Sequence, residues 1–263
     1  CGVWGWLGTL ALPFDDSERA IAPTLAPLAP ASVDDSALHA TILSFPGGLG
    51  EPGDEARARP RRGGYRFVKE AIDVVAACIL FVLALPVIGI IAVLIATTSP
   101  GGVFFRQTRV GQGMQPFQCL KFRTMVPDAE SILAKDPELA RIHALNWKLD
   151  NDPRVTRVGR FLRKTSLDEL PQLVNVINGE MSLIGPRPVQ FAEVREHYGE
   201  AAHTVFSVRP GVTGLWQVSG RSTTSYSARI ALDSAYVQEQ SLVIDLKILV
   251  KTVIVVVRGT GAH

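Results

Sequence analysis

Cysteine and histidine are scarce in this sequence, and their scarcity limits the chemistry that it can support. The three cysteines, Cys1, Cys78 and Cys119, lie far apart and form no metal-binding spacing. We therefore interpret them as free thiols of a reducing compartment. The five histidines show no HExxH or similar pattern, which argues against a zinc site.

A large net charge and the common nucleotide-binding loops are also lacking. The 27 basic and 25 acidic residues leave a net charge of only +2, so the composition indicates no nucleic-acid partner. The sequence contains no G-x-G-x-x-G pattern. Residues 159–165, GRFLRKT, are superficially similar to a P-loop, but Arg163 occupies the place of the glycine before the lysine.

The sequence instead contains one long apolar segment. Its hydrophobic content of 47% and its mean hydropathy of +0.19 are high for a soluble enzyme. Residues 72–96 carry a single charge, Asp73, and are long enough to cross a hydrocarbon core of about 30 Å as a helix. Pro86 lies near the middle of this segment and predicts a break or a kink.

The flanks of the apolar segment predict its topology. Basic residues lie on both sides of it, namely Arg57, Arg59, Arg61, Arg62, Arg66 and Lys69 before it and Arg106, Arg109, Lys121 and Arg123 after it. The positive-inside rule favours the cytoplasmic side for both flanks. We therefore predict a re-entrant membrane helix over residues 65–100, which enters one leaflet and returns. A kinked helix that crosses the membrane remains the alternative.

A basic run followed by two adjacent carboxylates marks the candidate site, within residues 152–188. The basic residues are Arg154, Arg157, Arg160, Arg163 and Lys164. Ser166 and Glu169 have the spacing of a capping box, which predicts a helix from Leu167. Asp168 and Glu169 would then lie in a first helical turn, which attracts anions and keeps a carboxylate nucleophile ionised. The alternative is that both acids merely complement the helix dipole.

The string KTSLDELPQLVNVINGEMSLIGPRP, residues 164–188, strongly resembles the core motif of the bacterial sugar transferases. These are monotopic polyprenyl-phosphate sugar-1-phosphate transferases. The resemblance runs from about Tyr65 to Gly259, and several separate motifs keep their order. It implies the same re-entrant topology. The family usually has a Ser-Pro pair at the helix break, whereas this chain has Leu85 before Pro86.

The resemblance also implies an activity. A sugar 1-phosphate would pass from a UDP-sugar to a polyprenyl phosphate, undecaprenyl phosphate, with release of UMP. This step would begin an exopolysaccharide or related glycan at the cytoplasmic face of the bacterial inner membrane. Mg²⁺ is the implied cofactor, because a carboxylate that approaches a diphosphate needs its charge neutralised. A catalytically inactive membrane scaffold and a glycosyltransferase that releases UDP stay open, and the sequence does not decide whether the chain forms a homodimer.

Seven residues make up the site that the resemblance implies. Asp168 is the predicted nucleophile, and Glu169 holds Mg²⁺ with it or orients it. The predicted phosphate ligands are Lys121, Arg163, Arg187, Arg209 and Arg221. The prolines of GPRP restrict the backbone on both sides of Arg187 and so predict a fixed guanidinium.

The expected fold is α/β and mostly helical. It is a membrane-associated monotopic domain with one re-entrant helix and interfacial amphipathic helices. Residues 1–64 form a disordered tail, because their Ala-, Pro- and Gly-rich part has no apolar period. Residues 101–263 form the domain at the cytosolic face, with a hairpin around Gly111 and Gly113. Residues 242–258 predict an interfacial helix, and a buried strand through VIVVV is the alternative.

Overall fold

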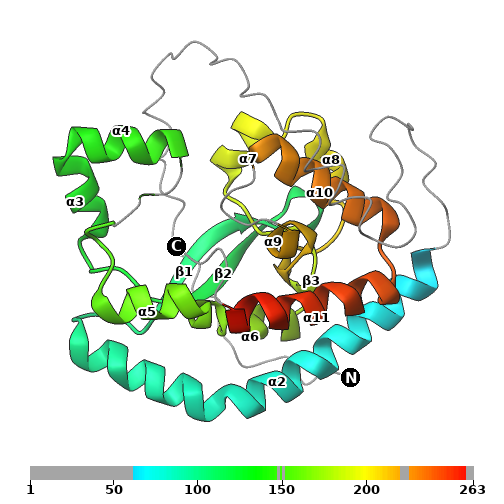
Figure 1. Cartoon of the computed structure of the whole chain (residues 1–263), viewed down its shortest axis with the longest axis horizontal. Coiled ribbons are helices and arrows are strands. Elements are labelled where there is room, and N and C mark those ends of the chain that lie inside the picture. The colour runs from blue at the N-terminus through cyan, green and yellow to red at the C-terminus, as the bar shows by residue number, and fades with distance from the viewer. Residues whose placement is uncertain (1–61, 147–148, 150–151, 220–224, 259–263) are drawn as a thin grey trace, which may run out of the picture. The chain divides into compact units, whose positions relative to one another are not determined.

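Helix α2 (Arg62–Thr98) is the longest element of the computed structural model, which describes residues 62–146, 149, 152–219 and 225–258. Within these residues, α2 is the helix that is long and apolar enough to cross a membrane. Pro86 lies inside α2, and the ribbon bends near its middle (Figure 1). Of the two predicted outcomes, a break or a kink, the helix shows a bend and stays continuous, since a bend accommodates the proline ring and its missing N–H.

In the part of the chain that the structure describes, four short strands form two separate sheets. They are β1 (Phe104–Val110), β2 (Pro116–Phe122), β3 (Ser182–Ile184) and β4 (Gly211–Thr213). β1 and β2 pair as an antiparallel hairpin, with Val110 opposite Pro116. The turn between them contains η2 (Gln112–Met114), where Gly113 adopts a φ of +65° that glycine tolerates. The predicted hairpin is therefore confirmed. β3 and β4 pair in parallel.

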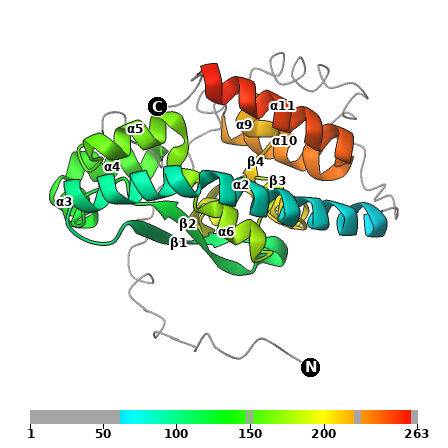
Figure 2. The same cartoon turned by 90° about the horizontal axis from the view of Figure 1, so that it is seen from below.

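Helices account for most of the rest, so the expectation of a mostly helical α/β fold is confirmed. They are α3 (Ala129–Lys135), α4 (Pro137–Asn146), α5 (Arg157–Thr165), η3 (Leu167–Glu169), α6 (Gln172–Ile177), α7 (Phe191–His197), α8 (Ala201–Val205), α9 (Leu215–Ser219), α10 (Tyr226–Glu239) and α11 (Leu242–Arg258). Figure 2 shows α10 and α11 next to each other. Leu232 of α10 and Ile248 of α11 share one core cluster with Ile184 of β3.

Residues 253–257, VIVVV, lie within helix α11, so the alternative of a buried strand is wrong. One face of α11 is buried through Asp245 and Ile248. The other face exposes apolar side chains, among them Val243, Leu246 and Val253. A helix with one face in the protein core and a second, exposed apolar face is typical of a helix that lies on a membrane surface.

Both halves of α2 pack on the same folded unit. Ala77, in the first half, lies in a cluster with Leu173 of α6. Ile91, in the second half, lies in a cluster with Phe122 of β2 and Leu162 of α5. Much of the remaining surface of α2 is apolar and exposed, as in the side chains of Phe67, Val75, Val82, Leu83, Ile90 and Val93.

Polar contacts hold both ends of α2 in place. Near its start, the Lys69 ammonium lies 3.3 Å from the carboxylate of Asp73 and 3.2 Å from that of Asp245 in α11. Just beyond its end, the guanidinium of Arg123 donates to the carbonyl of Pro100 at 2.7 Å. The two ends of the apolar helix are therefore tied to elements of one and the same unit.

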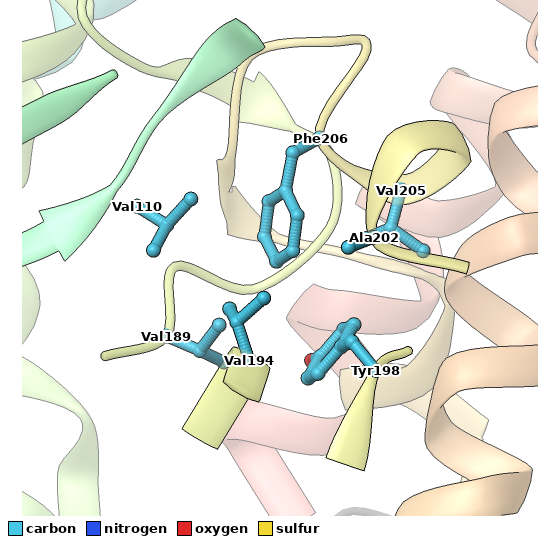
Figure 3. Packing of buried hydrophobic residues seen from close by; sticks show 7 residues of the cluster. All are labelled: Val110, Val189, Val194, Tyr198, Ala202, Val205 and Phe206. Carbon is cyan, nitrogen blue, oxygen red and sulfur yellow. The ribbon is translucent and has the colours of Figure 1, made fainter. Parts of the chain in front are cut away.

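A separate apolar cluster fixes the segment that follows β3. Phe206 lies between Val110, at the end of β1, and Ala202 of α8, with Val189 and Val194 below its ring in Figure 3. The N–H of Val110 donates to the carbonyl of Val189 at 2.9 Å. Burial of these side chains holds residues 185–189 against the β1–β2 hairpin, which matters because Arg187 belongs to this segment.

Candidate active site

Asp168 and Glu169 lie in a single 3-10 turn, η3, between helices α5 and α6. Ser166 ends α5 in the left-handed conformation, with φ +58°, and its side chain makes no capping hydrogen bond. The predicted capping box is therefore wrong, because an N-cap residue needs an extended backbone that Ser166 does not have. A helix does begin at Leu167, as predicted, but it is the 3-10 turn η3, and the α-helix begins at Gln172, after Pro171.

Glu169 is held by cations from two other elements. Its Oε1 atom lies 2.8 Å from Nζ of Lys121 on β2 and 3.6 Å from Nη2 of Arg187. Burial alone would raise the pKa of Glu169, but the positive charges of Lys121 and Arg187 outweigh burial and lower its pKa to about 2. Glu169 is therefore a permanent anion that fixes two cations beside the dyad.

Asp168 has a different environment, although it is the adjacent residue. Burial raises its pKa to about 6, the negative charge of Glu169 adds to the shift, and Lys121, Arg163 and Arg187 oppose it. Asp168 is thus still largely ionised at pH 7. These side-chain cations favour the ionised form, and Asp168 also lies in the first turn of η3.

Arg163 reaches the dyad from the last turn of α5. Its Nε donates to the hydroxyl of Thr124 at 2.9 Å, which fixes the guanidinium on the side of Asp168. Gly159 permits this arrangement, because a Cβ there would lie 2.0 Å from the carbonyl oxygen of Thr124. Any larger residue at position 159 would push α5, and with it Arg163, away from the end of β2.

Arg187 lies in a turn that is fixed in place, as the prolines of GPRP predict. The carbonyl of Pro186 accepts the N–H of Gly211 at 2.8 Å, and Gly185 donates to Thr213 at 2.9 Å, so the turn is bonded to β4. The guanidinium carbon of Arg187 lies 5.8 Å from the centre of the Trp216 ring, a cation–π distance. The structure therefore brings Lys121, Arg163 and Arg187 together around the two carboxylates.

Arg109 is a cation at this site that the sequence analysis did not single out. It lines the same small cavity as Glu169, Lys121 and Arg187. Its Nη1 lies 3.1 Å from Oε1 of Glu193, which also caps α7 in a capping box with Gln190. The sequence offered one signal for Arg109, since Gln107 and Arg109 occupy alternate positions of a strand and so lie on the same face. Only the pairing of β1 with β2 shows which way that face points.

The predicted phosphate ligand Arg209 lies apart from this group, and the predicted ligand Arg221 is not described. Arg209 lies 3.4 Å from Glu70 of α2, and both line a second cavity of about 230 Å³ beside the start of α2. Glu169 does not line that cavity. Arg221 lies outside the described residues. A phosphate-binding role for either arginine therefore stays a prediction.

The chemistry of the group suits a diphosphate substrate. Three cations, Lys121, Arg163 and Arg187, surround two carboxylates, and an arginine and a lysine are the usual partners of phosphate oxygens. Among the described residues, no three His, Cys, Asp or Glu side chains lie close enough to hold a metal by themselves. The dyad offers two adjacent carboxylates, which is the protein share that Mg²⁺ commonly takes when phosphates supply further ligands.

Comparison with known proteins places the chain in a family. The model of the bacterial sugar transferase family matches residues 64–259, so the chain belongs to that family. A UDP-galactose-lipid carrier transferase of Erwinia amylovora is 46% identical over 202 residues, which are 75% of this chain and 42% of that protein.

Two further relatives differ in length. The exopolysaccharide production protein ExoY of Rhizobium meliloti is 44% identical over 216 residues, covering 81% of this chain and 94% of that protein. The undecaprenyl-phosphate galactose phosphotransferase of Salmonella typhimurium is 43% identical over 203 residues, covering 75% of this chain and 42% of that protein. The chain thus spans less than half of two of these relatives and nearly all of the third.

Proposed function

We propose that the protein transfers a sugar 1-phosphate from a UDP-sugar to undecaprenyl phosphate and releases UMP. This reaction would start an exopolysaccharide or a related glycan. The observation that carries the proposal is the pair Asp168–Glu169 held among Lys121, Arg163 and Arg187. The names of the Salmonella and Rhizobium relatives support the acceptor and the pathway.

The geometry supports a covalent route in two steps. In the first, a carboxylate oxygen of Asp168 attacks the sugar-bearing phosphorus, the bond between that phosphorus and the bridging oxygen breaks, and UMP leaves. In the second, an oxygen of the lipid phosphate attacks the same phosphorus, and the bond to Asp168 breaks to restore the carboxylate. Two steps avoid bringing two polyanions together at once.

The three cations stabilise different carboxylates of the dyad. Arg163 faces Asp168, while Lys121 and Arg187 face Glu169, so positive charge lies on both sides of the attacking carboxylate. These groups are already in place before substrate binds, so charge that develops on phosphate oxygens meets fixed partners. Glu169 keeps Lys121 and Arg187 in position and does not itself need to change protonation.

Mg²⁺ fits the dyad when phosphate oxygens complete its ligands, and Asp168 and Glu169 would hold it. It would neutralise part of the negative charge of the donor diphosphate. The expected result is that chelation by EDTA abolishes UMP release and that added Mg²⁺ restores it, whereas activity that survives chelation would remove the metal from the proposal.

The membrane geometry also belongs to this proposal. Both ends of α2 are tied to one unit, at Lys69–Asp245 and at Arg123–Pro100, and its middle bends. A helix that crosses a bilayer would carry its ends to opposite sides, so these ties support a re-entrant helix. The exposed apolar face of α11 supports an interfacial position, at the cytoplasmic face of the inner membrane.

The nucleotide product separates this proposal from the alternatives. The purified protein would be incubated with undecaprenyl phosphate, Mg²⁺ and a panel of UDP-sugars, with Asp168→Asn as the inactive control. UMP release with one or more donors is expected. Release of UDP would indicate a glycosyltransferase instead, and a folded protein that releases neither nucleotide with any donor would indicate a scaffold.

A further inference from the structure

The outer edge of β2 is closed by a side chain and not by another strand. Among the described strands, only β1 pairs with β2, and it does so on one edge. On its other edge, the Oδ1 atom of Asn175 accepts the N–H of Leu120 at 3.0 Å, and Nδ2 donates to the carbonyl of Gln118 at 2.7 Å. A primary amide can do this because it carries a donor and an acceptor side by side, as a strand neighbour does.

The side-chain amide of Asn175 and its backbone carbonyl all have hydrogen-bond partners inside the protein. Asn175 is only 1% exposed. The carboxylate of Glu180 accepts a second bond from Nδ2 at 2.6 Å. The backbone carbonyl of Asn175 accepts the N–H groups of Glu180 and Met181 at 2.9 and 3.2 Å. Such a network defines one orientation of the amide, because a flipped or shifted amide would leave buried groups unpaired.

The two atoms that Asn175 binds flank Cys119, two positions before Lys121. Cys119 and Lys121 share one face of β2, and both line the cavity beside Glu169. Asn175 itself lies in α6, six positions after Glu169. The amide thus joins the segment that follows the dyad to the strand that carries its lysine, on the side opposite to the β1 pairing.

We propose that Asn175 is a positioning residue that fixes the strand register of β2 against α6 and thereby holds the Lys121 ammonium at Glu169. This inference rests on the proposed function only for its kinetic test. Without the amide, β2 would lose its hydrogen bonds to α6 and keep only apolar contacts there, such as that of Cys119 with the Leu173 cluster. The strand could then shift, and the long lysine side chain would sample other positions. Asn175 would act through Lys121 and would not touch the substrate.

The first test needs no activity. Asn175→Asp keeps the shape of the side chain but removes both Nδ2 donors. The rate at which Lys121 is reductively methylated would be measured by peptide mass spectrometry, without metal or donor, in the wild type and in Asn175→Asp. Tyr236→Phe is the control, because it also loses buried hydrogen bonds, to Ile184 and Asp245, but none to β2.

We expect methylation of Lys121 to be roughly tenfold faster in Asn175→Asp and unchanged in Tyr236→Phe, since loss of a coupled contact commonly changes an equilibrium by about this factor. An unchanged rate in a folded Asn175→Asp would overturn the proposal. If Asn175→Asp does not fold, Glu180→Ala carries the same test, with a smaller increase expected, because it removes one anchor of the amide and leaves Asn175 in place.

The second test is a double-mutant cycle on UMP release. If Asn175 acts through Lys121, Asn175→Asp should lower kcat in the wild-type background and cause no further loss in a Lys121→Met background. Tyr236→Phe should have the same effect in both backgrounds. Additive losses for Asn175→Asp would show that its role is merely structural. A wild type that releases no UMP would contradict the proposed function alone, because the methylation test would still decide the role of Asn175.

Discussion

Asp168 and Glu169 are adjacent carboxylates that the fold places in different electrostatic environments. Glu169 faces two cations at 2.8 and 3.6 Å and stays ionised. Asp168 depends on more distant positive charge to oppose its burial. This difference suits two roles, since the residue with the weaker ion pairs is the one whose oxygen is available to attack phosphorus.

Lys121→Met tests the role of the closest cation. The substitution keeps the length of the side chain but leaves Glu169 with Arg187 as its remaining close partner, so the charge around the donor diphosphate becomes more negative. We expect kcat/KM for UMP release to fall roughly 10²-fold, the usual effect of removing one preorganised group. Lys135→Met, at the exposed end of α3, is the control and should leave kcat/KM unchanged.

Asp233 provides a test of electrostatics away from the dyad. It is 1% exposed, and its Oδ2 has no hydrogen-bond partner. Burial raises its pKa to about 7, against the opposing charges of Arg229 and Arg187. The unfolded chain releases this proton near pH 4, so ionisation opposes folding increasingly between about pH 4 and 7, and fully above that range.

Asp233→Asn should therefore stabilise the protein more at pH 8 than at pH 5, by an amount on the order of a few kcal/mol. Thermal unfolding at the two pH values would measure this difference. Asp128→Asn, at an exposed position before α3, should show no such dependence on pH. An equal change in Tm at both pH values would mean that Asp233 has an ordinary pKa in the folded protein.

Some of these residues could be predicted from the sequence, and others required the fold. Asp168, Glu169 and Arg187 belong to one continuous motif, so the order of residues was enough to predict them as site residues. The capping box at Ser166 was predicted wrongly, because the spacing of Ser166 and Glu169 does not reveal a left-handed backbone. Arg109 and Asn175 were missed, since their contacts depend on how β2 lies between β1 and α6.

At the scale of elements, α2 is both an apolar helix and a structural support for the site. Its first half packs on α6, which follows the dyad, and its second half packs on α5 and β2, which carry Arg163 and Lys121. Apolar composition predicted the helix, but composition could not show that both halves rest on one unit. The position of α2 and the geometry of the site are therefore coupled.

The proposed re-entrant topology predicts that Arg62 and Arg106 lie on the same side of the membrane. Cysteines would be introduced at either position in a background without Cys1 and Cys78, while buried Cys119 is retained. An impermeant thiol reagent should then label neither position in intact cells and both in lysed cells. Labelling of one position but not the other in intact cells would show that α2 crosses the bilayer.

At the scale of the whole molecule, the apolar surfaces lie on elements far apart in sequence. Val82 and Leu83 of α2 and Leu246 and Val253 of α11 are exposed apolar side chains. Exposed apolar area of this extent is unusual for a soluble protein and is expected where lipid covers it. A lipid acceptor would reach such a protein along the same surface.

The segment before α2 should contribute little to this arrangement, because residues 20–60 have no apolar period. Deletion of residues 1–59 should leave the rate of UMP release in detergent within about twofold of the full chain. Circular dichroism would confirm that the shortened protein is folded. A folded but inactive protein would show that the segment takes part in the reaction.

The covalent intermediate tests the central claim most directly. The protein would be incubated with UDP-sugar and Mg²⁺ without undecaprenyl phosphate, and its intact mass measured. We expect the mass of one phosphosugar to be added to the wild type, to disappear when undecaprenyl phosphate is supplied, and to be absent from Asp168→Asn, which should also lack turnover. If Asp168→Asn instead releases UMP at a rate comparable to the wild type, Asp168 is not the nucleophile, and the lipid phosphate attacks the donor directly.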